Sequence, residues 1–221
     1  MVCRENVSTY RDRVRRSIPP WPLHSMVMTK GRLEAFSDGV IAILITIMVL
    51  ELRVPEGVDL ESLHHLLPEF CTYVLSFTFL GIYWNNHHHM MHMVDRVTGG
   101  ILWANLHLLF WLSLVTFATQ WMGANDTALV PTVVYGVVLL AAAFAYYTLQ
   151  LLIIRSQGPG SKLRAAIGSD LKGKMSPILY SAAIGSAFVH VRIAQAMFLL
   201  VALIWLIPDR RLERHHAITG S

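Results

Sequence analysis

The chain has 221 residues, of which 54% are hydrophobic and 14% are charged. So few charges cannot cover the surface of a soluble protein of this size, and the composition therefore indicates a membrane protein. The formal net charge of +4 does not favour a nucleic-acid partner here, because the basic residues alternate with apolar blocks and indicate membrane topology instead.

The chain begins with a basic segment over residues 1–28. This segment contains the proline-rich run Pro19-Pro20-Trp21-Pro22 and lacks the apolar stretch that is found in signal peptides. We expect it to form a disordered tail that precedes the membrane domain.

Six apolar blocks follow the tail, and a bilayer core about 30 Å thick needs roughly 20 helical residues to cross it. The blocks are residues 33–52, 66–86, 101–122, 129–154, 176–190 and 193–208. The last two are shorter, and we expect a tight hairpin between them because one continuous span would bury Arg192. The sequence thus predicts an all-α fold, with a six-helix transmembrane domain over residues 29–209 and a basic tail over residues 210–221.

Lysine and arginine residues predict the orientation, because the cytoplasmic loops of membrane proteins carry an excess of both. If both termini lie in the cytoplasm, sixteen of the eighteen basic residues lie on that side, and only Arg53 and Arg192 lie opposite. The connection from Glu51 to Glu69, on the opposite side, is acidic. We therefore expect a multi-pass protein of the cell membrane, embedded in the lipid bilayer, with both termini cytoplasmic.

The first block starts with a charged segment that includes Ser37 and Asp38. A carboxylate at the end of a membrane span is costly unless it is paired. The cytoplasmic ends of the second and third blocks carry polar residues at about the same depth, so we expect one buried network. Its expected members are Arg32, Ser37, Asp38, the run from Trp84 to His89, and Asn105. A simpler interpretation, compatible with the network, is that Ser37 and Asp38 cap the amino end of the first helix.

The second block ends in the run His87-His88-His89-Met90-Met91-His92. Within it, His88 and His92 are four residues apart and share one face of a helix, which is compatible with a metal ion. A zinc site usually adds a third protein ligand, and the only carboxylate close by in the sequence is Asp95. We therefore expect hydrogen bonding at the membrane interface, with no metal and no cofactor.

The apolar part of the first block carries a stripe at helical spacing, formed by Ile43, Thr46, Ile47 and Leu50. Such a stripe either packs against neighbouring helices or lines a pore, and packing is the more common role. A lone threonine in an apolar helix usually donates to the carbonyl four residues earlier, which is that of Ala42 here.

Two motifs carry a family resemblance. They are Arg32-x-x-x-Phe36-Ser37-Asp38-Gly39, before the aliphatic helix, and Tyr83-Trp84-x-x-His87-His88, at the end of the second block. Together they closely resemble the bacterial members of the transmembrane protein 175 family of potassium channels. The first motif is specific and the second is supportive. The resemblance covers the six-helix order from about residue 30 to residue 210.

The resemblance implies a homotetramer in which the first helix of each subunit lines a central pore for potassium ions. It also implies that the pore has no Thr-Val-Gly-Tyr-Gly filter loop, and this sequence contains none. The pore helix would be anchored by hydrogen bonds, which the resemblance assigns to Arg32, Phe36, Ser37, Asp38, Trp84 and His87 or His88.

In the resembled family the narrowest point of the pore is an aliphatic residue five positions after the aspartate, which is Ile43 here. A threonine implicated in cation preference matches Thr46, and further apolar layers match Ile47 and Leu50. Four isoleucines around an axis would exclude water. Because Ala42 offers no hydroxyl before the constriction, we do not expect strong selectivity for potassium over sodium.

The sequence therefore predicts a potassium-permeable cation channel with a hydrophobic gate, and no enzyme activity. An alternative is a proton channel or proton-coupled transporter that uses Asp38 and the histidines of the second block, since ionisable residues in membranes often mark proton relays. A third possibility is a membrane-embedded metal enzyme, which would need stoichiometric metal.

Overall fold

The computed structural model describes residues 28–55, 57–167 and 171–206. All regular elements within these ranges are helical, so the predicted all-α class is confirmed. Almost all of the expected tail 1–28 and all of the basic tail 210–221 lie outside the described residues. The elements are α2 (Lys30–Leu50), α3 (Leu60–His65), α4 (Leu67–His92), α5 (Gly99–Ala124), α6 (Leu129–Gln157), η2 (Gly158–Gly160), α7 (Lys162–Ile167), α8 (Leu171–Ala187) and α9 (Val191–Leu206).

Each of the six predicted blocks corresponds to one long helix. The expected hairpin is confirmed, because α8 ends at Ala187 and α9 begins at Val191. Arg192 nevertheless lies in the first turn of α9 and not in the connection. Two further differences concern α4 and its neighbourhood: α4 continues to His92, and the short helix α3 interrupts the connection before it.

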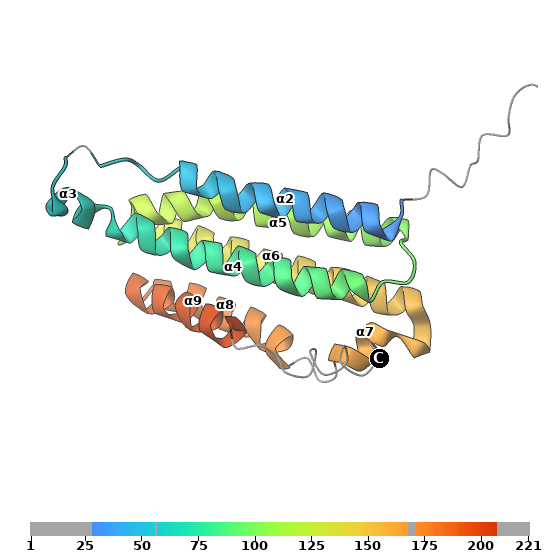
Figure 1. Cartoon of the computed structure of the whole chain (residues 1–221). Coiled ribbons are helices and arrows are strands. Elements are labelled where there is room, and N and C mark those ends of the chain that lie inside the picture. Colours follow the sequence, from blue (N-terminus) through green and yellow to red (C-terminus); the bar gives the residue numbers. More distant parts are fainter. Residues whose placement is uncertain (1–27, 56, 168–170, 207–221) are drawn as a thin grey trace, which may run out of the picture.

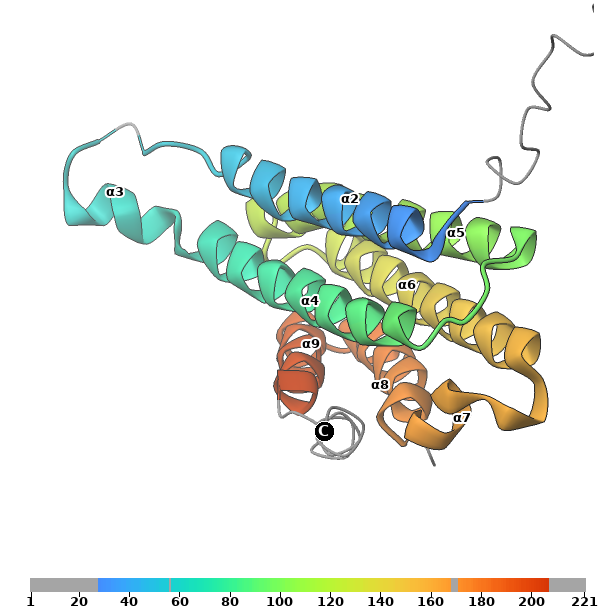
Figure 2. The same ribbon diagram turned by 45° about the vertical axis from the view of Figure 1, so that its right-hand side comes forward.

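The long helices run alongside one another (Figure 1). Helix α2 lies at one edge of the bundle and packs against α4 and α5, while α8 and α9 pack against each other and against α6. Figure 2 shows α2 and the α8–α9 hairpin on opposite sides of the layer that α4, α5 and α6 form. Helix α3 extends beyond the end of the bundle. Helix α2 is therefore a peripheral element of the helix bundle.

Three helical stretches in the described part of the chain are long and apolar enough to cross a membrane. They are Lys30–Leu50, Gly99–Ala124 and Leu129–Gly160, and the apolar helix Val191–Leu206 is shorter. The apolar window of α2 is only 22% buried within the subunit, compared with 44% for α5. An apolar helix that the rest of its chain covers so little requires another apolar environment, either lipid or further protein.

The core lies where α4, α5 and α6 meet. A buried hydrogen-bonded cluster and a close helix approach at a glycine stabilise it. The hydroxyl groups of Ser76 and Tyr135 lie 2.8 Å apart, and Thr119 donates to Ser76 at 2.7 Å, so three helices share one buried hydrogen-bonded cluster. Gly136 allows a close approach, because a Cβ atom there would lie 2.7 Å from Cγ1 of Ile184 and 2.9 Å from Cζ of Phe198. These contacts hold the scaffold against which α2 rests.

Candidate pore helix and its anchor

Helix α2 has two faces of different character. The buried face carries Leu33, Ser37, Ile41 and Met48, which recur at helical spacing and face α4 and α5. It contacts its neighbours mainly through apolar side chains, and Ser37 is the polar member of the set. The buried face thus fixes which side of α2 turns away from the helix bundle.

The side that turns away carries the predicted stripe. Ile43 is 55% exposed, Ile47 43% and Leu50 80%, and Thr46 between them is also exposed. The structure therefore brings these four residues together on one face that the described residues leave largely uncovered. Packing against the described residues, the more common role of an apolar stripe, accounts for only part of their surface.

The hydroxyl of Thr46 is held by the backbone of its own helix. Its Oγ1 donates to the carbonyl oxygens of Ala42 and Ile43, each at 3.0 Å, so the predicted bond to Ala42 is present. A hydroxyl has a single proton and two lone pairs. Because the proton points at the helix, the oxygen keeps acceptor capacity toward the exposed face.

A buried chain of hydrogen bonds anchors the amino-terminal half of α2. Ser37 donates to the carbonyl of Leu33 at 2.9 Å and accepts from Nδ2 of Asn105 at 2.9 Å. The amide oxygen of Asn105 lies 2.7 Å from Nε2 of His87. Ser37, Asn105 and His87 are fully buried. One polar residue from each of α2, α4 and α5 therefore takes part in the chain, as polar side chains between membrane helices commonly do, while Nδ1 of His87 is buried without a hydrogen bond to the described residues.

Asp38 joins α2 to α4 beside this chain. Its Oδ1 accepts from the indole Nε1 of Trp84 at 3.1 Å. Thr29 is the residue that caps α2, and its side chain accepts from the backbone amide of Arg32 at 3.4 Å. The interpretation of Ser37 and Asp38 as caps is therefore wrong, because the helix begins at Lys30 and both residues lie two turns further along.

Three predicted members of the anchor lie apart from the buried chain. Arg32 and Phe36 are on the exposed side of α2, and Phe36 is 47% exposed. His88 stacks on Trp84, with ring centroids 5.9 Å apart, and faces α2 at a different point. Of the two candidate histidines, His87 is thus the one that bonds to Asn105.

Sequence reasoning missed Glu34, whose Oε1 lies 3.2 Å from Nδ1 of His88 and 3.4 Å from Nε2 of His92. The antiparallel register of α2 and α4 predicts this contact. Since Asp38 contacts Trp84, one turn back along α2 reaches Glu34 while one turn forward along α4 reaches His88. A second turn pairs Lys30 with His92, whose carbonyl accepts from the Lys30 ammonium. The carboxylate beside His88 and His92 in space is thus Glu34, which lies far away in the sequence.

The comparisons with known proteins bear on these same elements. Residues 32–115, which include most of α2, all of α4 and more than half of α5, match the family model described as "Endosomal/lysosomal potassium channel TMEM175". A relative from a Chryseobacterium species, named a potassium channel, is 56% identical over 187 residues, which is 85% of this chain and 97% of the relative. The chain belongs to the TMEM175 family.

The predicted resemblance is therefore confirmed, and the fold agrees with it. A crystal structure of a lysosomal potassium-selective channel TMEM175 homolog from Chamaesiphon minutus superposes with a TM-score of 0.71 at 29% identity, covering 80% of this chain and 96% of that one. The rat TMEM175, named an endosomal/lysosomal proton channel, is 30% identical over 110 residues, covering 43% of this chain and 22% of the rat protein. In this TMEM175 member, the family match thus contains every residue of the buried anchor.

Proposed function

We propose that the protein is a potassium-permeable channel in which α2 from each of four identical subunits lines a central pore. The observation that carries this proposal is the exposed stripe at Ile43, Thr46, Ile47 and Leu50, on a helix whose opposite face is tied down by buried hydrogen bonds. The names of the bacterial relatives support potassium as the ion. The proposed channel domain extends over residues 29–209, with six spans in each subunit.

The stripe has the chemistry of a gate followed by a polar layer. Four Ile43 side chains around an axis form an apolar constriction that water leaves readily, so an ion passes only when the ring widens. One turn further on, four Thr46 oxygens offer acceptors, because their protons are directed at the backbone. Potassium loses less on partial dehydration than sodium does, so this arrangement favours potassium moderately.

The charge distribution supports an orientation with both termini in the cytoplasm. Arg192, one of the two basic residues assigned to the outside, pairs there with Asp126, whose Oδ2 lies 2.8 Å from its Nη2. Lys162 pairs with Asp95 at the proposed cytoplasmic end, at 3.4 Å. The acidic outer connection, which includes Asp59 and Glu61, would raise the local concentration of cations.

Ion flux across liposome membranes tests the proposal. Purified protein in potassium-loaded liposomes should pass potassium faster than sodium, and Ile43→Asn should raise the flux and reduce the preference, because a polar ring holds water. Ile178→Asn is the matched control, since Ile178 is 68% exposed but lies on α8. No potassium flux above that of empty liposomes, or the same increase in both variants, would contradict the proposal.

Assembly tests the same proposal independently. α2 encloses a pore only if several subunits place their exposed stripes around one axis. Native mass measurement in detergent should therefore give four subunits, and a monomer would remove the pore.

Proton conduction through Asp38 is the alternative, and the name of the rat relative keeps it open. The geometry favours anchoring, because Asp38 is paired with an indole N–H and the buried chain passes through an amide, and neither group releases protons near neutral pH. Asp38→Asn discriminates between the two roles. Loss of assembly supports the anchor, whereas normal assembly with abolished proton flux supports the alternative.

A further inference from the structure

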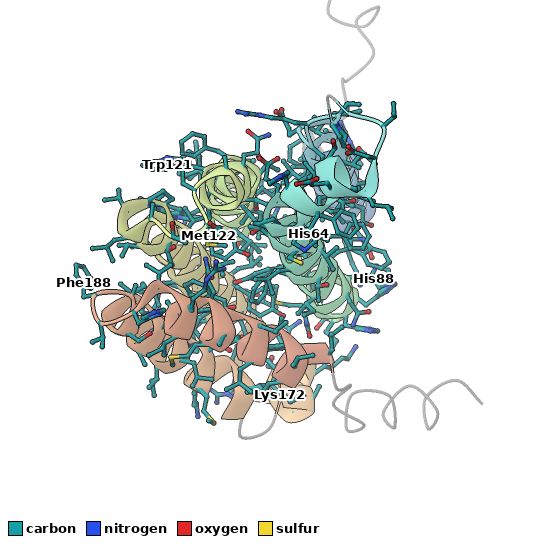
Figure 3. All side chains as sticks on the ribbon, turned by 90° about the vertical axis from the view of Figure 1, so that its left-hand side faces the viewer. His64, His88, Trp121, Met122, Lys172 and Phe188 are labelled. Atoms are coloured by element: carbon teal, nitrogen blue, oxygen red, sulfur yellow. The ribbon has the colours of Figure 1, made fainter. Side chains whose placement is uncertain are left out.

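Three side chains with metal-binding atoms converge at the end of the bundle where α2 begins and α4 ends. Glu34 from α2 and His88 and His92 from α4 each offer one ligand atom, and these atoms all lie within 4.8 Å of one another. The buried anchor uses none of the three. Figure 3 shows His88 at the outer surface of the bundle, away from the helix core.

The distances fit a small tetrahedral ion. Zinc binds imidazole nitrogen and carboxylate oxygen at about 2.0–2.2 Å, which places neighbouring ligand atoms of a tetrahedron about 3.4 Å apart. The Nε2 atoms of His88 and His92 lie 3.1 Å apart, and Oε1 of Glu34 lies 3.4 Å from Nε2 of His92. Two of the three ligand separations therefore match neighbouring ligand atoms of such an ion, and all three ligand atoms lie within 4.8 Å of one another.

The local structure holds these ligands in place. His88 and His92 are one helical turn apart, the spacing that lets two histidines on one helix share an ion. The indole of Trp84 stacks on the His88 ring with an interplanar angle of 26°, and Trp84 is itself fixed by Asp38. Nδ1 of His88 is buried without a hydrogen bond to the described residues, and it lies 3.2 Å from Oε1 of Glu34, so the ring already faces the carboxylate.

The exposure of the ligands suits a site that exchanges its ion with solvent. The Glu34 side chain is 16% exposed, that of His88 35% and that of His92 49%. Three protein ligands with an open fourth position leave room for water, as in zinc sites that are not purely structural. Glu34 supplies a negative charge, which partly offsets the two positive charges of the ion.

We propose that Glu34, His88 and His92 bind one divalent transition-metal ion per subunit, with Zn²⁺ as the favoured ion. The ion bridges the amino end of α2 to the carboxyl end of α4, one turn from the Asp38–Trp84 contact. The competing explanation is that Glu34 only pairs with protonated imidazoles. Binding does not require the proposed channel activity, so the two are tested by different measurements.

Equilibrium dialysis of the untagged, full-length protein in detergent against ⁶⁵Zn²⁺ tests the site. We expect about one ion per subunit in the wild-type protein. Glu34→Gln and His92→Ala should each weaken binding roughly tenfold or more, because each removes a ligand from a set of three. His64→Ala is the matched control, since His64 lies on α3 beyond the other end of the bundle, and its loss should leave this binding unchanged.

Two further measurements keep the result decisive. Size-exclusion profiles identical to wild type show that the variants fold. If His92→Ala does not fold, Glu34→Gln still tests the site, because glutamine keeps the shape of the glutamate side chain. Co²⁺ added in place of Zn²⁺ should give the visible absorption of a tetrahedral nitrogen-and-oxygen site, and Glu34→Gln should abolish it. Equal Zn²⁺ binding by the wild type and by folded Glu34→Gln and His92→Ala would overturn the proposal.

Discussion

Replacing Asn105 by alanine tests the buried anchor of α2 directly. The change removes two interhelical hydrogen bonds, from Nδ2 to Ser37 and between Oδ1 and His87. It also leaves Nε2 of His87 buried without its partner, and a buried group in that state costs about 1–3 kcal/mol. Interhelical hydrogen bonds in a membrane protein average about 0.6 kcal/mol, so two lost bonds alone give about 1.2 kcal/mol. We expect a loss of about 1–3 kcal/mol in the free energy of unfolding.

The assay is reversible unfolding in mixed micelles, with helicity followed as the denaturing detergent is titrated. Asn85→Ala is the matched control, because it removes the same side chain from an exposed position of α4 and should change the free energy of unfolding little. A double-mutant cycle with Ser37→Ala isolates the bond between the two side chains, and we expect a coupling energy of about 0.5–2 kcal/mol. Full additivity of the two changes, or equal losses for Asn105→Ala and Asn85→Ala, would refute the reasoning.

Two further predictions concern the scaffold and the outer connection. Gly136→Ala should destabilise the protein by about 1–3 kcal/mol, because the new Cβ would lie 2.9 Å from the Phe198 ring. Gly185→Ala is the control, since the space around Gly185 is open and the change should not destabilise the protein. Thermal melting compares the two variants. Two hydrogen bonds lower the pKa of the Asp59 carboxyl below its ordinary 3.8. The larger effect comes from the side chain of Ser62, and the smaller from its backbone amide. The stabilisation of α3 by this cap is therefore complete above pH 3.8 and is lost as the pH falls through the lowered pKa. An NMR titration in which Ser62→Ala leaves the pKa of Asp59 unchanged would contradict this assignment.

The sequence by itself determined the helices, because hydrophobic length and helical spacing are local properties of the chain. Residues within about one helical turn of each other determine the apolar blocks and the hairpin around His190. They also determine the hydrogen bond from the Thr46 hydroxyl to the carbonyl of Ala42. The family resemblance rests on two short motifs that are also local, and the comparisons confirm it. The roles assigned to Ile43 and Leu50 stay predictions, since they depend on subunits that must assemble around α2.

Only the tertiary structure decided which polar groups meet. Asn105 was expected to join Ser37 from the depth of the two blocks, but the choice of His87 over its neighbour His88 depends on the rotation of α4 about its axis. Adjacent residues on a helix point about 100° apart, so the rotation of α4 about its axis decides which of the two faces Asn105. Glu34 is separated from His88 by more than fifty residues of chain, and no local pattern connects them. The antiparallel register of α2 and α4 brings the two together, and that register is set by packing across the whole bundle.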